Sequence, residues 1–213
     1  DTKKLGRGEL AQISIDENLS QNDITIKILD TISDKDLLKE LPSDSLSIEF
    51  INYIKEFKKI KFELNKHEEI YSNHILTEPI KLIKYLIFRY KFRQSSEKKI
   101  LLDYPPYLLI EPVSACNLRC PFCFQTDKSF TTKSNMGIMK FDLFKKVVDE
   151  ADELGVGAIT LASRGEPTMN KKLDLMLEYL SEKKNIFEVK INTNGTFLTE
   201  KLCHTILKTK VNQ

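Results

Sequence analysis

Three cysteines lie within eight residues, in the segment Cys116-Asn117-Leu118-Arg119-Cys120-Pro121-Phe122-Cys123. Their spacing is C-x3-C-x2-C, and three thiolates on so tight a loop can each bind a different iron of a 4Fe–4S cube. Clusters that only transfer electrons usually have four Cys ligands. Three ligands leave one iron open to a small molecule, much as an open catalytic zinc site leaves a position for substrate.

Two other readings of this loop stay open, a zinc site and unligated core cysteines. Zinc would need a fourth ligand, and the candidates are distant in the sequence: Cys203, His204, His67 and His74. Cys203 itself lies in a helical pattern that predicts a buried thiol. Disulfides are disfavoured because neighbouring thiols close only tiny loops, so the clustering indicates a reducing compartment and a cytoplasmic protein.

Strands alternate with helices from Tyr107 onward, which predicts an α/β fold with a parallel sheet. Gly155 is a suitable C-terminal stop for the first helix. Right-handed crossovers place the carboxyl ends of all strands on one rim, where such folds bind ligands. The expected strands are 107–113, 158–162 and 187–191, and the expected helices are 141–154, 171–180 and 200–207.

Two further polar segments follow the second and third expected strands. The first of them is Ser163-Arg164-Gly165-Glu166-Pro167. Gly165 permits close approach of the backbone. Asn192-Thr193-Asn194-Gly195-Thr196 ends the third strand. Taken alone, each segment is more typical of a turn.

Residues 105–213 resemble the radical S-adenosylmethionine (radical SAM) superfamily, whose signature is C-x3-C-x-aromatic-C with Phe122 at the aromatic position. The resemblance implies that Cys116, Cys120 and Cys123 hold the cluster and that Phe122 lies near the adenine. The segment at 163–167 resembles the Gly-Gly-Glu-Pro motif that binds the methionine ammonium, which assigns Ser163, Gly165 and Glu166 to the cofactor. Arg164 departs from that motif. The later segment resembles Thr-Asn-Gly, so Thr193 and Asn194 are expected to line the site.

The resemblance implies one-electron reduction of S-adenosylmethionine and formation of a 5′-deoxyadenosyl radical that removes hydrogen from a substrate. The reductant would be a protein such as flavodoxin or ferredoxin, and no residue is assigned to the substrate chemistry. Met136-Gly137 is similar to a segment of the peptide-modifying SPASM-type members, although a linker with two buried methionines is favoured. A peptide or protein is the first substrate candidate, and a sugar or small metabolite is the second. The rival functions are a zinc-binding structural module and an inactive truncated relative.

The fold that the resemblance implies is a parallel partial TIM-type barrel, (βα)6 in the full protein. About three βα units are present here, so we expect a fragment that lacks the C-terminal half. We expect two domains, residues 1–100 of unknown role and residues 105–213 from the radical SAM core.

The N-terminal region is expected to be mainly helical. Alternating isoleucines in residues 11–29, namely Ile13, Ile15, Ile24, Ile26 and Ile28, predict two short strands. Residues 34–93 are expected to be helical, with Ser33 as a cap, an apolar face from Phe50 to Leu64 and Pro79 in a first turn. The polar tract 93–99 is interpreted as the linker between domains.

The overall charge gives no support to a nucleic-acid function, because the formal net charge is only +2 over 213 residues. The apolar stretch Ile80–Phe92 is too short for a membrane span and is interrupted by basic residues. No signal peptide is visible. The basic residues between Lys81 and Lys99 are interpreted as a solvated helix face rather than an RNA or membrane surface.

Overall fold

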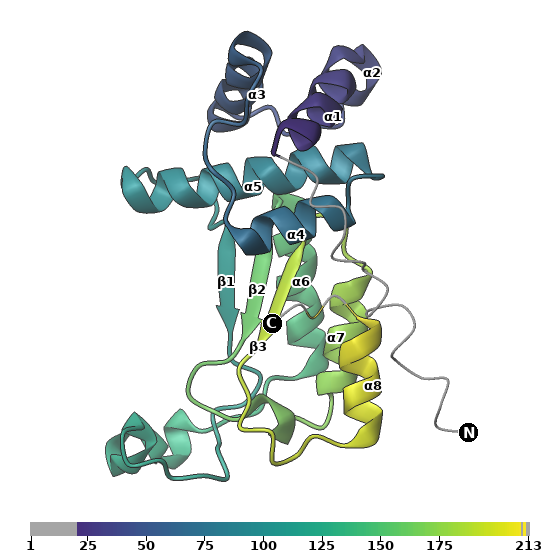
Figure 1. Ribbon diagram of the computed structural model, residues 1–213. Coiled ribbons are helices and arrows are strands. Elements are labelled where there is room, and N and C mark those ends of the chain that lie inside the picture. The colour runs from purple at the N-terminus through teal and green to yellow at the C-terminus, as the bar shows by residue number, and fades with distance from the viewer. Residues whose placement is uncertain (1–20, 210, 212–213) are drawn as a thin grey trace, which may run out of the picture. The chain divides into compact units, whose positions relative to one another are not determined.

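Three parallel strands form one sheet in the computed structural model, which describes residues 21–209 and residue 211. They are β1 (Tyr107–Ile110), β2 (Ala158–Leu161) and β3 (Glu188–Ile191), in the order β1-β2-β3. In the register, Ile110 is opposite Leu161 and Leu161 is opposite Ile191, so the three strands end level with one another. The expected α/β fold with a parallel sheet is confirmed. The arrowheads in Figure 1 show that all three carboxyl ends lie at one edge.

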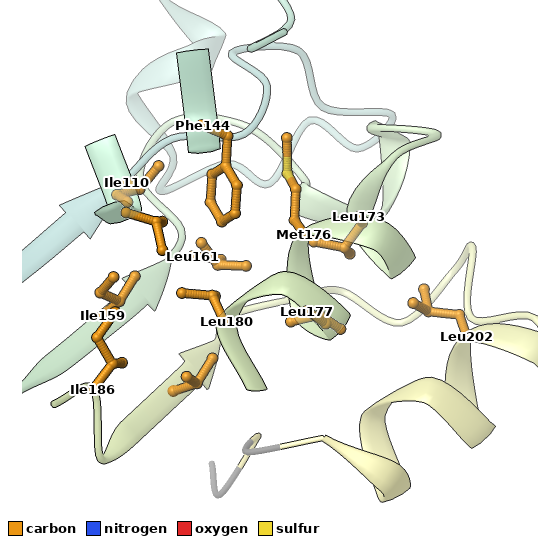
Figure 2. Packing of buried hydrophobic residues seen from close by; sticks show 12 residues of the cluster. Ile110, Phe144, Ile159, Leu161, Leu173, Met176, Leu177, Leu180, Ile186 and Leu202 are labelled. Carbon is orange, nitrogen blue, oxygen red and sulfur yellow. The ribbon is translucent and has the colours of Figure 1, made fainter. Parts of the chain in front are cut away.

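Three amphipathic helices cover one face of this sheet: α6 (Phe141–Leu154), α7 (Leu173–Ser181) and α8 (Glu200–Lys208). Gly155 ends α6 in the left-handed region, at φ 86°, as its position predicted. Figure 2 shows Phe144 from α6 and Leu180 from α7 packed against Ile159 and Leu161 of β2. This apolar layer holds the strands in register and so fixes the loops that follow them.

The segments that leave the carboxyl edge are mostly loops and short 3-10 helices. These helices are η2 (Phe124–Thr126), η3 (Lys128–Thr131), η4 (Lys133–Asn135) and η5 (Pro167–Met169). Ile138 forms an antiparallel bridge with Val113, and Met136 and Met139 are half-buried, so the expected linker with two buried methionines is wrong. Val211 forms a parallel bridge with Val189 of β3.

The described residues divide into two compact units that meet between Leu101 and Leu102. The N-terminal unit is helical, and its core includes Phe50 and Tyr90, whose rings stack with centroids 5.1 Å apart. Its helices are α1 (Gln21–Ser33), α2 (Lys35–Leu38), α3 (Ser45–Phe57), α4 (Lys66–His74) and α5 (Pro79–Glu97). Pro79 lies in the first turn of α5, as expected.

The strand expected around Ile24 and Ile28 is wrong, because both residues belong to α1. They are buried, whereas Ile26 between them is 51% exposed. Ile24, Ile28 and Ile32 are spaced four residues apart and form one face of a helix. This helical spacing outweighs the two-residue alternation that predicted a strand. Ile13 and Ile15 lie outside the described residues.

Three smaller expectations in this unit also need correction. Asp34, not Ser33, caps α2 with its side chain, because a carboxylate at that position accepts from two backbone N–H groups. The expected apolar face from Phe50 to Leu64 does not lie on a single helix, because α3 ends at Phe57, and the side chain of Phe57 is 51% exposed. The interpreted linker is helical as far as Glu97.

The basic face of α5 is partly buried rather than solvated, which corrects the expectation for Arg89, Lys91 and Arg93. Arg89 Nε and Arg93 Nη2 each lie 2.6 Å from the carboxylate of Glu68, whose side chain is completely buried. Lys91 Nζ lies 2.5 Å from Asp44, and its side chain is 7% exposed. These cations therefore pair with carboxylates inside the helical unit. Within the described part of the chain, no helix is both long and apolar enough to cross a membrane.

Candidate functional site

The cysteine loop leaves β1 at the carboxyl edge and is folded by its own backbone. Cys123 N–H donates to the Cys120 carbonyl at 2.9 Å, which closes a tight turn between these two cysteines. Leu118 N–H donates to the Cys116 sulfur at 3.5 Å, and Arg119 donates to the Cys116 carbonyl at 2.7 Å. All three thiols are free and partly buried. The loop is thus ordered by contacts that leave the sulfurs available as ligands.

Gly165 fixes the end of β2 against this loop. A Cβ at this position would overlap the carbonyl oxygen of Val113 and come within 2.7 Å of that of Ala115. Glu166 N–H also donates to the Ala115 carbonyl at 2.9 Å. Only glycine permits so close a contact between the two backbones, so the close approach expected of Gly165 is to the cysteine loop.

Glu166 is buried at the centre of the edge and joins the ends of β2 and β3. Its Oε1 accepts from Thr168 N–H (3.0 Å), Thr168 Oγ1 (2.6 Å) and Thr193 Oγ1 (2.5 Å). Its Oε2 accepts from Asn194 N–H at 2.6 Å. Burial alone would raise the pKa of Glu166, but these donors hold that pKa below its usual value, led by the Asn194 N–H. The group is therefore a carboxylate at neutral pH.

Three polar side chains form a closed ring of hydrogen bonds beside Cys116. Asn194 Nδ2 donates to Asn117 Oδ1 at 3.0 Å, and Asn117 Nδ2 donates to Thr196 Oγ1 at 2.8 Å. Thr196 Oγ1 donates to Asn194 Oδ1 at 2.7 Å and closes the ring. Asn194 Nδ2 also lies 3.8 Å from the Cys116 sulfur. The ring links the cysteine loop to the end of β3.

Arg164, the residue that departs from the Gly-Gly-Glu-Pro pattern, pairs with Glu111 at the end of β1. Its Nε and Nη2 lie 2.9 and 2.7 Å from the carboxylate, which also accepts from Arg164 N–H at 2.9 Å. Burial would raise the pKa of Glu111, but the hydrogen bonds from Arg164 and Ser114 and the guanidinium charge lower that pKa to about 2. Beside this pair, Ser163 has φ 101°, a strained conformation for a residue with a side chain.

The buried side chain of Gln125 connects the segments that follow β1 and β2. Its Nε2 donates to the carbonyl of Ser114 at 2.7 Å and to the carbonyl of Arg164. The Arg164 carbonyl lies in the segment that resembles the ammonium-binding motif, between Ser163 and Gly165. Gln125 therefore fixes the direction of that carbonyl.

The structure brings eight of the nine expected site residues into one network or one loop. Cys116, Cys120 and Cys123 share the loop, and Gly165, Glu166, Thr193 and Asn194 are tied to it by the contacts above. Phe122 projects from the loop and is 92% exposed, available to a ligand. Ser163 is exposed beside this network, at the strained position.

The donor set suits an iron–sulfur cluster. No three His, Cys, Asp or Glu side chains converge to hold a single metal ion in residues 21–209 or at 211. A 4Fe–4S cube does not need such convergence, because each thiolate binds a different iron. Cys203, expected to be buried, is exposed, because α8 turns the adjacent Leu202 inward instead.

Four participants were not expected from the sequence: Glu111, Asn117, Gln125 and Thr196. For Glu111 a signal existed, since Glu111 and Arg164 are opposite charges just beyond neighbouring parallel strands. For the other three residues no sequence signal was present, because their roles depend on how the loops fold back onto one another.

These features define an α/β protein whose candidate site occupies the carboxyl edge of a parallel sheet, where such folds bind ligands. Residues 110–213 match the family described as the Radical SAM superfamily, and this part of the chain belongs to that superfamily. Membership implies two cofactors, a 4Fe–4S cluster and S-adenosylmethionine.

Two curated relatives each match a little less than half of the chain. The tungsten-containing aldehyde ferredoxin oxidoreductase cofactor-modifying protein of Pyrococcus furiosus is 37% identical over 98 residues, 45% of this chain and 26% of the relative. The GTP 3′,8-cyclase of Desulforamulus reducens is 31% identical over 94 residues, 44% of this chain and 28% of the relative. The matched part thus spans little more than a quarter of these relatives.

A solved structure, BtrN in complex with AdoMet and 2-DOIA, matches with 28% identity and a TM-score of 0.46. The match covers 53% of this chain and 45% of BtrN.

Proposed function

We propose that this chain carries the cofactor-binding part of a radical SAM enzyme, within a (βα)6 partial barrel. When bound, the cluster supplies the electron that splits the C5′–S bond of S-adenosylmethionine into methionine and a 5′-deoxyadenosyl radical, which removes hydrogen from substrate. The single observation that supports this assignment is the network through Glu166, which ties the cysteine loop to two other strand ends.

Different residues of the chain would bind the cluster and the parts of S-adenosylmethionine. Cys116, Cys120 and Cys123 hold three irons, and the turn between Cys120 and Cys123 spaces two of the thiolates. Within the described residues, Glu166 Oε2 accepts one hydrogen bond, from Asn194 N–H, so it keeps a lone pair for the methionine ammonium, and its negative charge attracts that cation. Phe122 offers an apolar face to the adenine.

Three residues would position the cofactor rather than react. Gln125 directs the Arg164 carbonyl, and Thr193 and Asn194 close the wall of the site at β3. Electrons would come from a reduced flavodoxin or ferredoxin. Of the substrate classes, a peptide or protein chain is the first candidate and a sugar or small metabolite the second.

Anaerobic reconstitution tests the assignment. We expect about four iron and four sulfide per chain, and loss of the brown absorbance when any one of Cys116, Cys120 or Cys123 is replaced by Ala. Cys203→Ala is the matched control, and it should load a full cluster because this cysteine is exposed on α8. One equivalent of zinc without labile sulfide would overturn the proposal in favour of a zinc module.

A further inference from the structure

The three cysteines of the loop are not in equivalent surroundings. The Cys116 sulfur lies within hydrogen-bonding distance of two N–H donors, Leu118 N–H at 3.5 Å and Asn194 Nδ2 at 3.8 Å. Within the described residues, no hydrogen bond to the sulfur of Cys120 or Cys123 is formed. Leu118 belongs to the loop itself, whereas Asn194 reaches Cys116 from the end of β3, 78 positions away.

The orientation of the Asn194 amide is fixed at both ends. Its oxygen accepts from Thr196 N–H at 3.0 Å and from Thr196 Oγ1 at 2.7 Å, so the NH2 group must face the cysteine loop. One hydrogen of that group goes to Asn117 Oδ1 at 3.0 Å, which leaves the other for the sulfur. The backbone of Asn194 is held in turn by Glu166 Oε2. Rotation of the amide would break two hydrogen bonds of the ring, together with the bond from Thr196 N–H.

A hydrogen bond to a ligand sulfur changes the energetics of a cluster. The sulfur carries more negative charge when the cluster is reduced, so an N–H donor stabilises the reduced form more than the oxidised form. Hydrogen bonds to the sulfurs are among the factors that set cluster reduction potentials. A donor held in one orientation has this effect without having to reorganise when the electron arrives.

We propose that Asn194 is a positioning residue for the cluster: its amide, oriented by the Asn117–Asn194–Thr196 ring, donates to Cys116 and raises the reduction potential of a cluster bound there. This role differs from lining the cofactor site, and it rests on the proposed function, because it requires Cys116 to be a cluster ligand. A residue that follows β3 would thus affect how readily a cluster on the loop after β1 accepts an electron.

The test is an anaerobic redox titration of the reconstituted full chain without S-adenosylmethionine, followed by the electron paramagnetic resonance signal of the reduced cluster. Asn194→Ala should make reduction about tenfold less favourable at a given potential, which for a one-electron couple is a shift of about 59 mV to more negative values. Asn194→Asp, which replaces the donor by a negative charge in the same volume, should shift the potential further in that direction. Iron and sulfide content should not change.

Asn192→Ala is the matched control in the same loop. Asn192 is exposed and donates to the Leu161 carbonyl through its backbone N–H, a bond that the substitution keeps. Its potential should equal that of the wild type. Thr196→Val breaks the ring but leaves Asn194 present, so it should shift the potential in the same direction by a smaller amount.

The outcomes separate this proposal from the function on which it rests. A fully loaded Asn194→Ala with an unchanged potential overturns the role of Asn194 and leaves the cluster assignment intact. If Asn194→Ala does not load a cluster, the reduction potential of Thr196→Val tests the proposal instead. An unchanged potential in that variant overturns the proposal. A wild-type chain that loads zinc or no metal refutes the proposed function itself.

Discussion

Among the described residues, each unit contains one almost fully buried glutamate, Glu68 or Glu166, and the two are held in opposite ways. Glu68 in the helical unit is paired with Arg89 and Arg93. Glu166 in the α/β unit accepts only from backbone N–H groups and hydroxyls, and within the described residues no Lys or Arg pairs with it. The first charge is neutralised inside the protein. The second has no such cation beside it at the carboxyl edge of the sheet, where a cationic ligand would be attracted to it.

The largest expected effect comes from the neutralised carboxylate. Glu68→Ala removes the carboxylate that pairs with Arg89 and Arg93 in a mostly buried position, and it removes the acceptor for the Asn65 N–H in the capping box of α4. We expect the free energy of unfolding to fall by about 3–5 kcal/mol. Urea denaturation followed by circular dichroism measures this change.

The matched control for that experiment is Asp36→Ala. Asp36 pairs with Lys39 at 2.7 Å, but the two side chains are 87% and 76% exposed, so water screens the pair. We expect a change below about 1 kcal/mol. Equal losses in the two variants would mean that burial does not distinguish these ion pairs.

Glu166→Gln tests the other half of the comparison. The new NH2 group would face donors that now point at a carboxylate, so we expect a loss of about 1–3 kcal/mol of stability. Loss of the charge should also weaken S-adenosylmethionine binding on the order of ten- to a hundredfold, with the cluster retained. Calorimetry and iron analysis measure both.

Glu150→Gln, on the exposed surface of α6, is the control for Glu166. It removes the same charge without removing a buried acceptor, and both stability and affinity should stay at the wild-type values. If Glu166→Gln binds the cofactor as tightly as the wild type, then the buried charge only holds the strand ends together.

Glu111 sharpens the comparison, because it lies at the same edge as Glu166 but is paired with a cation as Glu68 is. Its folded pKa of about 2 lies below the ordinary value of 4.5. A lowered folded pKa contributes stability that is complete above pH 4.5 and is lost as the pH falls toward 2. Since Arg164 is 35% exposed, we expect the contribution to be about 1 kcal/mol.

Unfolding of the wild type and of Glu111→Gln between pH 7 and pH 3 measures this contribution. The gap in stability should be constant near neutral pH and should narrow below about pH 4.5. A gap that persists unchanged to pH 3 would show that Glu111 does not titrate with a lowered pKa.

The elements of the α/β unit were predictable because the hydrophobic period of each element agrees with the residues that end it. The helix at 141–154 was expected with the bounds that α6 has, since its apolar stripe ends at a glycine suited to the left-handed region. The helical unit was less predictable. Ile24, Ile26 and Ile28 fit a strand as well as a helix, and only the packing of Ile32 on the same face distinguishes the two.

The site was predictable as three separate motifs and not as a network. Residue types and strand ends indicated the cysteines, Glu166 and Asn194. The hydrogen bonds that join them depend on how three loops approach one another, which no local pattern records. Asn117 shows this most clearly, because its side chain bonds to Thr196 in the loop after β3, 79 positions away.

The ring beside Cys116 has a consequence for the order of folding. The bond between Asn117 and Thr196 joins residues 79 positions apart, so the ring cannot close before β3 has paired with β2 and brought its loop to the edge. Contacts so distant in the chain form late, because loop closure is costly. During synthesis, the cysteine loop emerges well before the segment that completes its surroundings. An iron–sulfur cluster inserted at that early stage would therefore bind to a loop without its ring, and would gain the Asn194 donor only when β3 docks.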